Sequence, residues 1–158
     1  RVESIGVFNG VEYFDDSKGT NVGATVAAIS GLGKERKIVV VLGGDGKGQD
    51  FSPLVDAVRK YVRAVVLIGK DRTIIDEALQ SVNLPKVLVD TMANAVFAAA
   101  EVAHYGDAVL LSPACASLDM FDNYMHRGQV FKTEVLALFA QVTNKATIKN
   151  VTEKDVAL

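Results

Sequence analysis

Short apolar runs alternate with amphipathic stretches along most of the chain, which is the pattern of strands that alternate with helices. The first two runs are separated by Asn9-Gly10, a strong signal for a tight hairpin. Lys37–Leu42 is apolar without alternation, as parallel strands buried on both faces are. We therefore expect an α/β fold: a Rossmann-like three-layer domain with a mostly parallel sheet and an N-terminal antiparallel hairpin.

Turn and capping residues mark the limits of several expected elements. Asn21 is placed to cap the first helix and Gly33 to end it. The expected strands are Ser4–Phe8, Val11–Phe14, Lys37–Leu42, Ala64–Ile68, Lys86–Val89 and Asp107–Leu111. The expected helices are Val22–Leu32, Phe51–Tyr61, Asp71–Gln80, Thr91–His104 and about Ser117–Phe139, the last open to an interruption near Gly128. The end of the chain is polar and weakly patterned, so we expect one domain over residues 1–142 and a tail or short extra helix over 143–158.

Length and charge narrow the class of protein. The chain has 158 residues, enough for one domain with a sizeable core, and its net charge of −2 excludes the basic surface typical of nucleic-acid-binding proteins. No apolar run reaches the roughly 18 residues that predict a transmembrane helix, and a lone cysteine, Cys115, excludes an internal disulfide. The chain begins with Arg1 rather than Met, so we expect a fragment or processed chain whose partner domain holds part of the chemistry.

Three polar segments follow expected strands directly: Asp15–Asn21, Gly43–Lys47 and Ser112–Ser117. In open α/β sheets, ligands bind beyond the carboxyl ends of the strands. Because these ends lie along one edge of the sheet, we expect the three segments to form one site there.

The glycine-rich segment does not match the nucleotide-binding motifs. A P-loop needs a glycine where this chain has Val41, and Ser or Thr where it has Gly48. The dinucleotide fingerprint fails too, because Gln49 stands in place of its third glycine. What is left is a tight loop with backbone N–H groups and Lys47, suited to a carboxylate or phosphate. An ordinary turn with a solvated lysine is the alternative.

The other two segments also have two interpretations. Asp16 and Lys18 contact a polar ligand near a helix N-terminus, or they belong to a solvated loop. Ser117, at the expected start of the last helix, caps that helix or holds a ligand carboxylate.

Other reactive side chains point to no chemistry of their own. No histidine neighbours Cys115 in the sequence, so we interpret it as a small buried thiol rather than a nucleophile. We favour no role for His104, which ends a helix, or for His126 and Arg127 on the last helix.

Taken together, the polar segments resemble motifs of the Mur ligase family, in its C-terminal domain, and the resemblance runs from Arg1 to about Phe139. The motifs are Asp16-Ser17-Lys18-Gly19-Thr20-Asn21, then Leu42-Gly43-Gly44-Asp45-Gly46-Lys47, then Leu111-Ser112-Pro113-Ala114-Cys115-Ala116-Ser117-Leu118-Asp119 with Phe121. Sister ligases carry a different first motif, which favours the branch of the family that adds D-glutamate.

The resemblance implies the C-terminal domain of a three-domain, cytoplasmic ligase of bacterial peptidoglycan synthesis. Such a ligase uses ATP and Mg²⁺ to join D-glutamate to UDP-N-acetylmuramoyl-L-alanine through an acyl phosphate that the amine attacks. The family's P-loop and magnesium ligands lie in its central domain. The resemblance therefore implies that this chain alone is inactive and holds no metal.

The resemblance also implies roles for single residues, although it assigns no catalytic one. Gly19 departs from the Ala that relatives often carry, which loosens its loop. Lys47, Thr20, Ser117 and the Leu118 backbone would hold the carboxylates of D-glutamate, with Tyr124 beside them, while Arg1, Asp16 and Lys18 would face the nucleotide.

Two other classes of protein stay open at this stage. One is a stand-alone binding module for an acidic amino acid or a nucleotide. The other is a phosphoacceptor domain with Asp15 and Asp16 in an acidic pocket, which is disfavoured because these residues follow a hairpin rather than a central strand. A P-loop encoded upstream in the same gene would exclude both.

Overall fold

The computed structural model of the chain describes residues 2–156, with side chains for residues 2–141. Its centre is a six-stranded sheet with the order β1-β2-β6-β3-β4-β5. All neighbouring strands are parallel except β1 and β2, which pair antiparallel. The strands are β1 (Glu3–Phe8), β2 (Val11–Asp15), β3 (Ile38–Gly43), β4 (Val62–Ile68), β5 (Lys86–Leu88) and β6 (Ala108–Leu111). The expected α/β fold with an N-terminal hairpin is confirmed.

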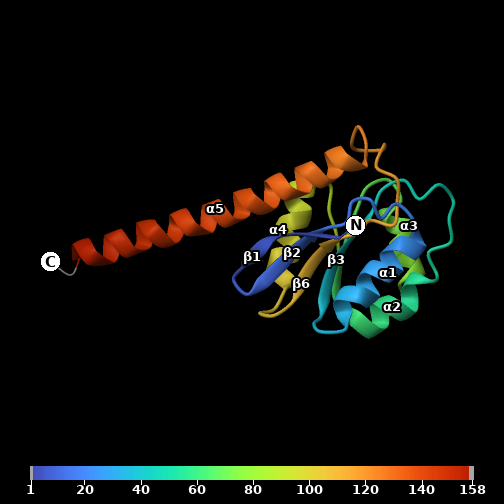
Figure 1. Cartoon of the computed structure of the whole chain (residues 1–158), viewed down its shortest axis with the longest axis horizontal. Coiled ribbons are helices and arrows are strands. Elements are labelled where there is room, and N and C mark those ends of the chain that lie inside the picture. Colours follow the sequence, from blue (N-terminus) through green and yellow to red (C-terminus); the bar gives the residue numbers. More distant parts are fainter. Residues whose placement is uncertain (1, 157–158) are drawn as a thin grey trace.

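Helices cover both faces of the sheet (Figure 1). One apolar core joins α1, α2 and α3 to side chains such as Val40 and Leu110, and a second core joins α4 and α5 to Val39 and Val109 on the other face. Neighbouring residues of β3 and β6 thus enter opposite cores, which explains their continuous apolar sequence. The helices are α1 (Val22–Gly33), α2 (Leu54–Tyr61), α3 (Arg72–Ala78), α4 (Met92–Val102) and α5 (Tyr124–Val156).

Local signals in the sequence set the hairpin and the first helix. Asn9 and Gly10 both have positive φ, at 51° and 74°, as tight hairpin turns require. The side chain of Asn21 accepts a 2.9 Å hydrogen bond from the N–H of Ala24, so the expected cap is confirmed.

The last helix differs from the expectation in its start and its continuity. It begins at Tyr124, because the residues after Ser117 close a turn in which the N–H groups of Met120 and Phe121 both donate to the Ser117 carbonyl. Asn123 caps the helix instead, by accepting a 2.8 Å hydrogen bond from the N–H of His126. The helix passes through Gly128 unbroken.

Beyond the sheet, α5 continues as one helix that projects away from the rest of the molecule (Figure 1). Residues 143–156 are therefore helical, while residues 157–158 lie outside the described range. The domain boundary at residue 142 stays a prediction. None of the helices in the described residues is both long and apolar enough to cross a membrane.

Gly43 should be more sensitive to substitution than a helical glycine. Its φ is +127°, and an added Cβ would lie 1.7 Å from the Ile68 carbonyl oxygen, so the backbone would have to move. We expect Gly43→Ala to lower the free energy of unfolding by more than about 2 kcal/mol. Gly31, within α1, has open space at its Cβ position, so Gly31→Ala should raise that free energy by about 0.5–1 kcal/mol. Urea unfolding followed by circular dichroism measures both, and equal effects would contradict the prediction.

Candidate functional site

The three polar segments meet at the carboxyl edge of the sheet, as expected. The N–H of Asp16 donates to the Leu111 carbonyl at 2.7 Å, and the N–H of Gly43 donates to the Pro113 carbonyl at 2.9 Å. Asp45 and Ala116 exchange two backbone hydrogen bonds, of 3.0 and 2.9 Å. Backbone contacts thus fix the positions of the three segments relative to one another.

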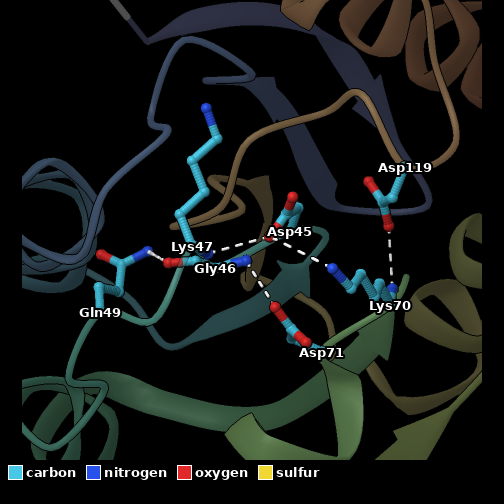
Figure 2. Close-up of polar contacts among 7 residues, drawn as sticks. All are labelled: Asp45, Gly46, Lys47, Gln49, Lys70, Asp71 and Asp119. Atoms are coloured by element: carbon cyan, nitrogen blue, oxygen red, sulfur yellow. Dashed lines mark hydrogen bonds and ion pairs between the residues drawn. The ribbon is translucent and has the colours of Figure 1, made fainter.

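The glycine-rich loop presents Lys47 to solvent. Its backbone is held from behind: the N–H of Gly46 donates to Asp71 Oδ2 at 2.7 Å, and the N–H of Lys47 donates to Asp45 Oδ1 at 3.0 Å. Lys47 itself has φ 49°, a conformation rare for a residue with a side chain. Figure 2 shows its side chain extending away from the two carboxylates. Among the described residues no partner pairs with its ammonium group, which is therefore available to an anionic ligand.

Gln49 joins the segments, a role that the sequence did not indicate. Its Nε2 donates to the carbonyls of Gly46, at 3.2 Å, and of Ala114, at 2.6 Å. Its Oε1 accepts the N–H of Val22, the first residue of α1, at 3.0 Å. These partners lie as far as 65 positions away, so no local pattern could have revealed them.

The loop after β4 adds a fourth segment to this edge, which no motif in the sequence indicated. The N–H of Lys70 donates to Asp119 Oδ2 at 2.9 Å, and the Lys70 ammonium lies 4.0 Å from Asp45 Oδ1 (Figure 2). The N–H of Asp71 donates to the Gly44 carbonyl at 3.0 Å. The glycine-rich loop is thus hydrogen-bonded to the segment after β6 and to the loop after β4.

Asp16 lies inside a buried polar network rather than in open solvent. The hydroxyl of Ser112 donates to Asp16 Oδ2 at 2.8 Å, and the hydroxyl of Thr25 donates to the Ser112 carbonyl at 3.0 Å. Lys18 is exposed and Thr20 is half-buried.

The predicted residues after β6 differ in how far they are exposed. Ser117 is buried and starts the turn described above, so its expected position at the start of a helix is wrong. Leu118, within that turn, and Tyr124, the first residue of α5, are exposed. Arg1, the remaining predicted residue, lies outside the described residues.

A pocket of about 330 Å³ beside α5 is lined by two of the predicted residues, Lys18 and Tyr124. Asp15 in its wall is half-buried, and this burial raises the pKa of its carboxyl group, with the neighbouring charges of Glu3 and Asp16 adding to the effect. The pocket offers charges of both signs to a polar ligand. Its lining includes Glu3, Asp15, Ser17, Lys18, Tyr124 and Lys132.

Arg127 has a structural role that the sequence did not indicate. It is only 2% exposed, and its guanidinium donates to the hydroxyl of Ser17 at 2.9 Å, to the Ser17 carbonyl at 2.6 Å and to the Cys115 carbonyl at 2.9 Å. Burial lowers the pKa of Arg127 to about 10, which leaves the group charged at neutral pH. It thus lies behind the site and touches two of its segments.

Cys115 is fully buried, which confirms its interpretation as a packed thiol. Burial raises the pKa of the thiol to about 12, so the reactive thiolate is scarcely populated at neutral pH. Among the described residues, no group of three or more His, Cys, Asp or Glu side chains is arranged to hold a metal ion.

Comparison with known proteins identifies the family. The family model described as "Mur ligase, glutamate ligase domain" matches residues 1–115. A UDP-N-acetylmuramoylalanine–D-glutamate ligase of Albidiferax ferrireducens is 65% identical over 135 residues, which cover 85% of this chain and 27% of the relative. The enzyme of the same name from a Polaromonas species is 65% identical over 138 residues, which cover 87% of this chain and 24% of the relative.

A solved structure agrees in fold. It is a domain from a Haemophilus ducreyi protein named for UDP-N-acetylmuramate:L-alanyl-γ-D-glutamyl-meso-diaminopimelate ligase, with a TM-score of 0.55 and 18% identity, and the match covers 85% of this chain and 99% of that domain. The chain spans about a quarter of the length of the curated relatives that it matches. With its fold, its three motifs at one sheet edge and these relatives, the chain belongs to the Mur ligase family, where it corresponds to the glutamate ligase domain.

Proposed function

We propose that this chain is the C-terminal domain of a cytoplasmic, ATP-dependent amide ligase that adds D-glutamate to UDP-N-acetylmuramoyl-L-alanine in peptidoglycan synthesis. The observation that carries the proposal is the exposed, unpaired Lys47 ammonium among the described residues, on the loop that joins the other site segments. The names and the 65% identity of the relatives support the same substrate.

D-Glutamate brings two carboxylates and an amine that must be oriented. Lys47 supplies a mobile point charge for one carboxylate. The hydroxyl groups of Thr20 and Ser117 and the backbone N–H of Leu118 add donors, and Tyr124 closes one side of the site. Fixing the amino acid in this way makes its attack on the activated carboxylate effectively unimolecular.

This domain is proposed to contact only one side of the nucleotide. Asp16, Lys18 and Arg1 are proposed to face ATP, with the Asp16 carboxylate accepting hydrogen bonds from ribose hydroxyls. The buried Ser112–Asp16 contact supports this role because it fixes the carboxylate in one orientation. ATP supplies the phosphoryl group that activates the carboxylate of the UDP-linked substrate as an acyl phosphate. The residues present fit one wall of such a site, so we place the P-loop and the ligands of Mg²⁺ in the rest of the protein.

Residues 1–158 are proposed to form only part of the active site. Because the P-loop and magnesium ligands are proposed to lie elsewhere, residues 1–158 should fold without catalysing ligation. Phosphate release with ATP, UDP-N-acetylmuramoyl-L-alanine and D-glutamate tests this, with the full-length protein as the positive control. Turnover by the isolated chain would contradict the domain assignment.

Lys47 and Ser117 should affect D-glutamate more than ATP. Losing a charged hydrogen-bonding partner costs about 1.5–3 kcal/mol, so Lys47→Ala in the full-length protein should raise the KM for D-glutamate about ten- to hundredfold. Ser117→Ala should act in the same direction but more weakly, because it removes a neutral donor. Lys34→Ala, which alters an exposed lysine beyond α1, is the control. A rise in the KM for ATP without one for D-glutamate would assign the loop to the nucleotide.

Cys115 should be dispensable for chemistry, so Cys115→Ala should keep activity within about a hundredfold of the parent.

The pKa of the Cys115 thiol also predicts a dependence of stability on pH. Because burial raises the thiol pKa from 9.0 to about 12, this group's contribution to stability is complete below pH 9 and is lost as the pH rises toward 12. Between those values the free energy of unfolding of the parent should fall more steeply than that of Cys115→Ala. Parallel curves in urea unfolding would be the contrary result.

A further inference from the structure

The guanidinium of Arg127 donates its hydrogen bonds to two loops and not to a carboxylate. Among the described residues its hydrogen-bond partners are Ser17 and Cys115, and no carboxylate lies within ion-pair distance of it. Burying this cation is costly, because the attraction of Asp15 and Asp119 does not offset the desolvation that lowers the pKa of Arg127. Packing an apolar side chain here would cost less, so stability alone does not account for an arginine at this position.

The contacts of Arg127 close a ring around the back of the site. From the first turns of α5, the guanidinium reaches the hydroxyl and the carbonyl of Ser17. The Ser17 hydroxyl in turn donates to the carbonyl of Tyr124, at 2.6 Å, back on α5. A further N–H of Arg127 holds the Cys115 carbonyl, two residues before Ser117.

Each segment in this ring carries a residue of the proposed site. Ser17 lies between Asp16 and Lys18 and shortly before Thr20, while Cys115 shortly precedes Ser117. Tyr124 begins the helix that Arg127 itself belongs to. The guanidinium is rigid and planar, so the directions of its N–H groups fix these segments at set distances.

We infer that Arg127 is a positioning residue for the ligase reaction, holding the nucleotide-facing loop, the glutamate-facing loop and the start of α5 in one arrangement. This inference rests on the proposed function for the identity of the substrates, but not for the geometry. Arg127 is too deeply buried to touch either substrate, so it acts through Ser17 and Cys115.

As a positioning residue, Arg127 should have a kinetic signature different from that of Lys47. Without the contacts from Arg127, the loop around Ser17 should become less ordered. This loop carries Asp16 and Lys18, which are proposed to face ATP, and Thr20, which is proposed to bind D-glutamate. The affinities for ATP and D-glutamate should therefore fall together. The rate should fall as well, since a displacement of about 1 Å can cost about a hundredfold. A purely stabilising residue would lower the folded fraction while leaving both KM values unchanged.

The test compares Arg127→Lys and Ser17→Ala with the parent in the full-length protein. Arg127→Lys keeps the charge but loses the planar fork, and Ser17→Ala removes one hydroxyl and is a milder change if the arginine variant does not fold. We expect Arg127→Lys to raise both KM values at least fivefold and to lower kcat/KM at least tenfold for each substrate. Ser17→Ala should do the same to a smaller extent, and the double variant should be little worse than Arg127→Lys.

Arg63→Lys is the matched control. Arg63 forms a two-point contact with Asp107, of 2.6 and 3.1 Å, near the start of β4 at the opposite edge of the sheet. Arg63→Lys should leave the KM values for ATP and D-glutamate at the parental level. Parental KM values in folded Arg127→Lys and Ser17→Ala would overturn the inference, as would equal effects of Arg63→Lys.

A second readout does not depend on which substrate is used. Amide hydrogen exchange of the full-length protein without ligands should speed up in peptides covering residues 16–21 and 113–120 of Arg127→Lys, but not of Arg63→Lys. If the parent fails to ligate D-glutamate, the proposed function is wrong, while faster exchange in both peptides still supports the positioning role. Unchanged exchange in both peptides would overturn that role even if the parent is an active ligase.

Discussion

The close approach of backbones at the carboxyl edge of the sheet is the constraint on which the site depends. Gly44 lies so near the loop after β6 that an added Cβ would stand 2.4 Å from the Ala116 carbonyl oxygen. This proximity lets Asp45 and Ala116 pair through their backbones and brings Gln49 within reach of Ala114. The polar groups of the loops are thus satisfied by one another, which allows the loops to pack together without leaving buried donors unpaired.

The carboxylates on the loops of the site are held by hydrogen bonds, whereas two of the lysines on these loops are exposed. Asp71 and Asp119 accept backbone N–H groups, and Asp16 accepts a hydroxyl. Lys47 and Lys18 extend from the same framework into solvent. Carboxylates therefore order the loops while the exposed cations remain available to anionic ligands, which suits an acidic amino acid and a nucleotide.

Much of the fold could be predicted because its signals are local. The Asn9-Gly10 turn, the Asn21 cap and the unbroken apolar strands each depend on a few neighbouring residues. The start of α5 was misplaced since both Ser117 and Asn123 can cap a helix, and only the intervening turn decides between them.

The site was predicted only in part for a different reason. Motifs located the loops, but Gln49 and Arg127 act on partners 65 and 110 positions away in the sequence. Neither residue type nor spacing reveals such a contact. Arg127 also directly follows five exposed residues, 122–126, so the sequence before it is that of a surface segment, and only the folded chain shows that Arg127 is buried.

The unbroken course of α5 has a mechanical consequence. The helix contains 33 residues, and at a rise of about 1.5 Å per residue it is about 50 Å long. Its first turns carry Tyr124 and Arg127, whereas its far end projects beyond the sheet (Figure 1). A continuous helix behaves as a lever, so a small tilt imposed at the distant end is transmitted to its root. Because Arg127 lies on this helix, a tilt of α5 would also move the contacts of Arg127 with Ser17 and Cys115.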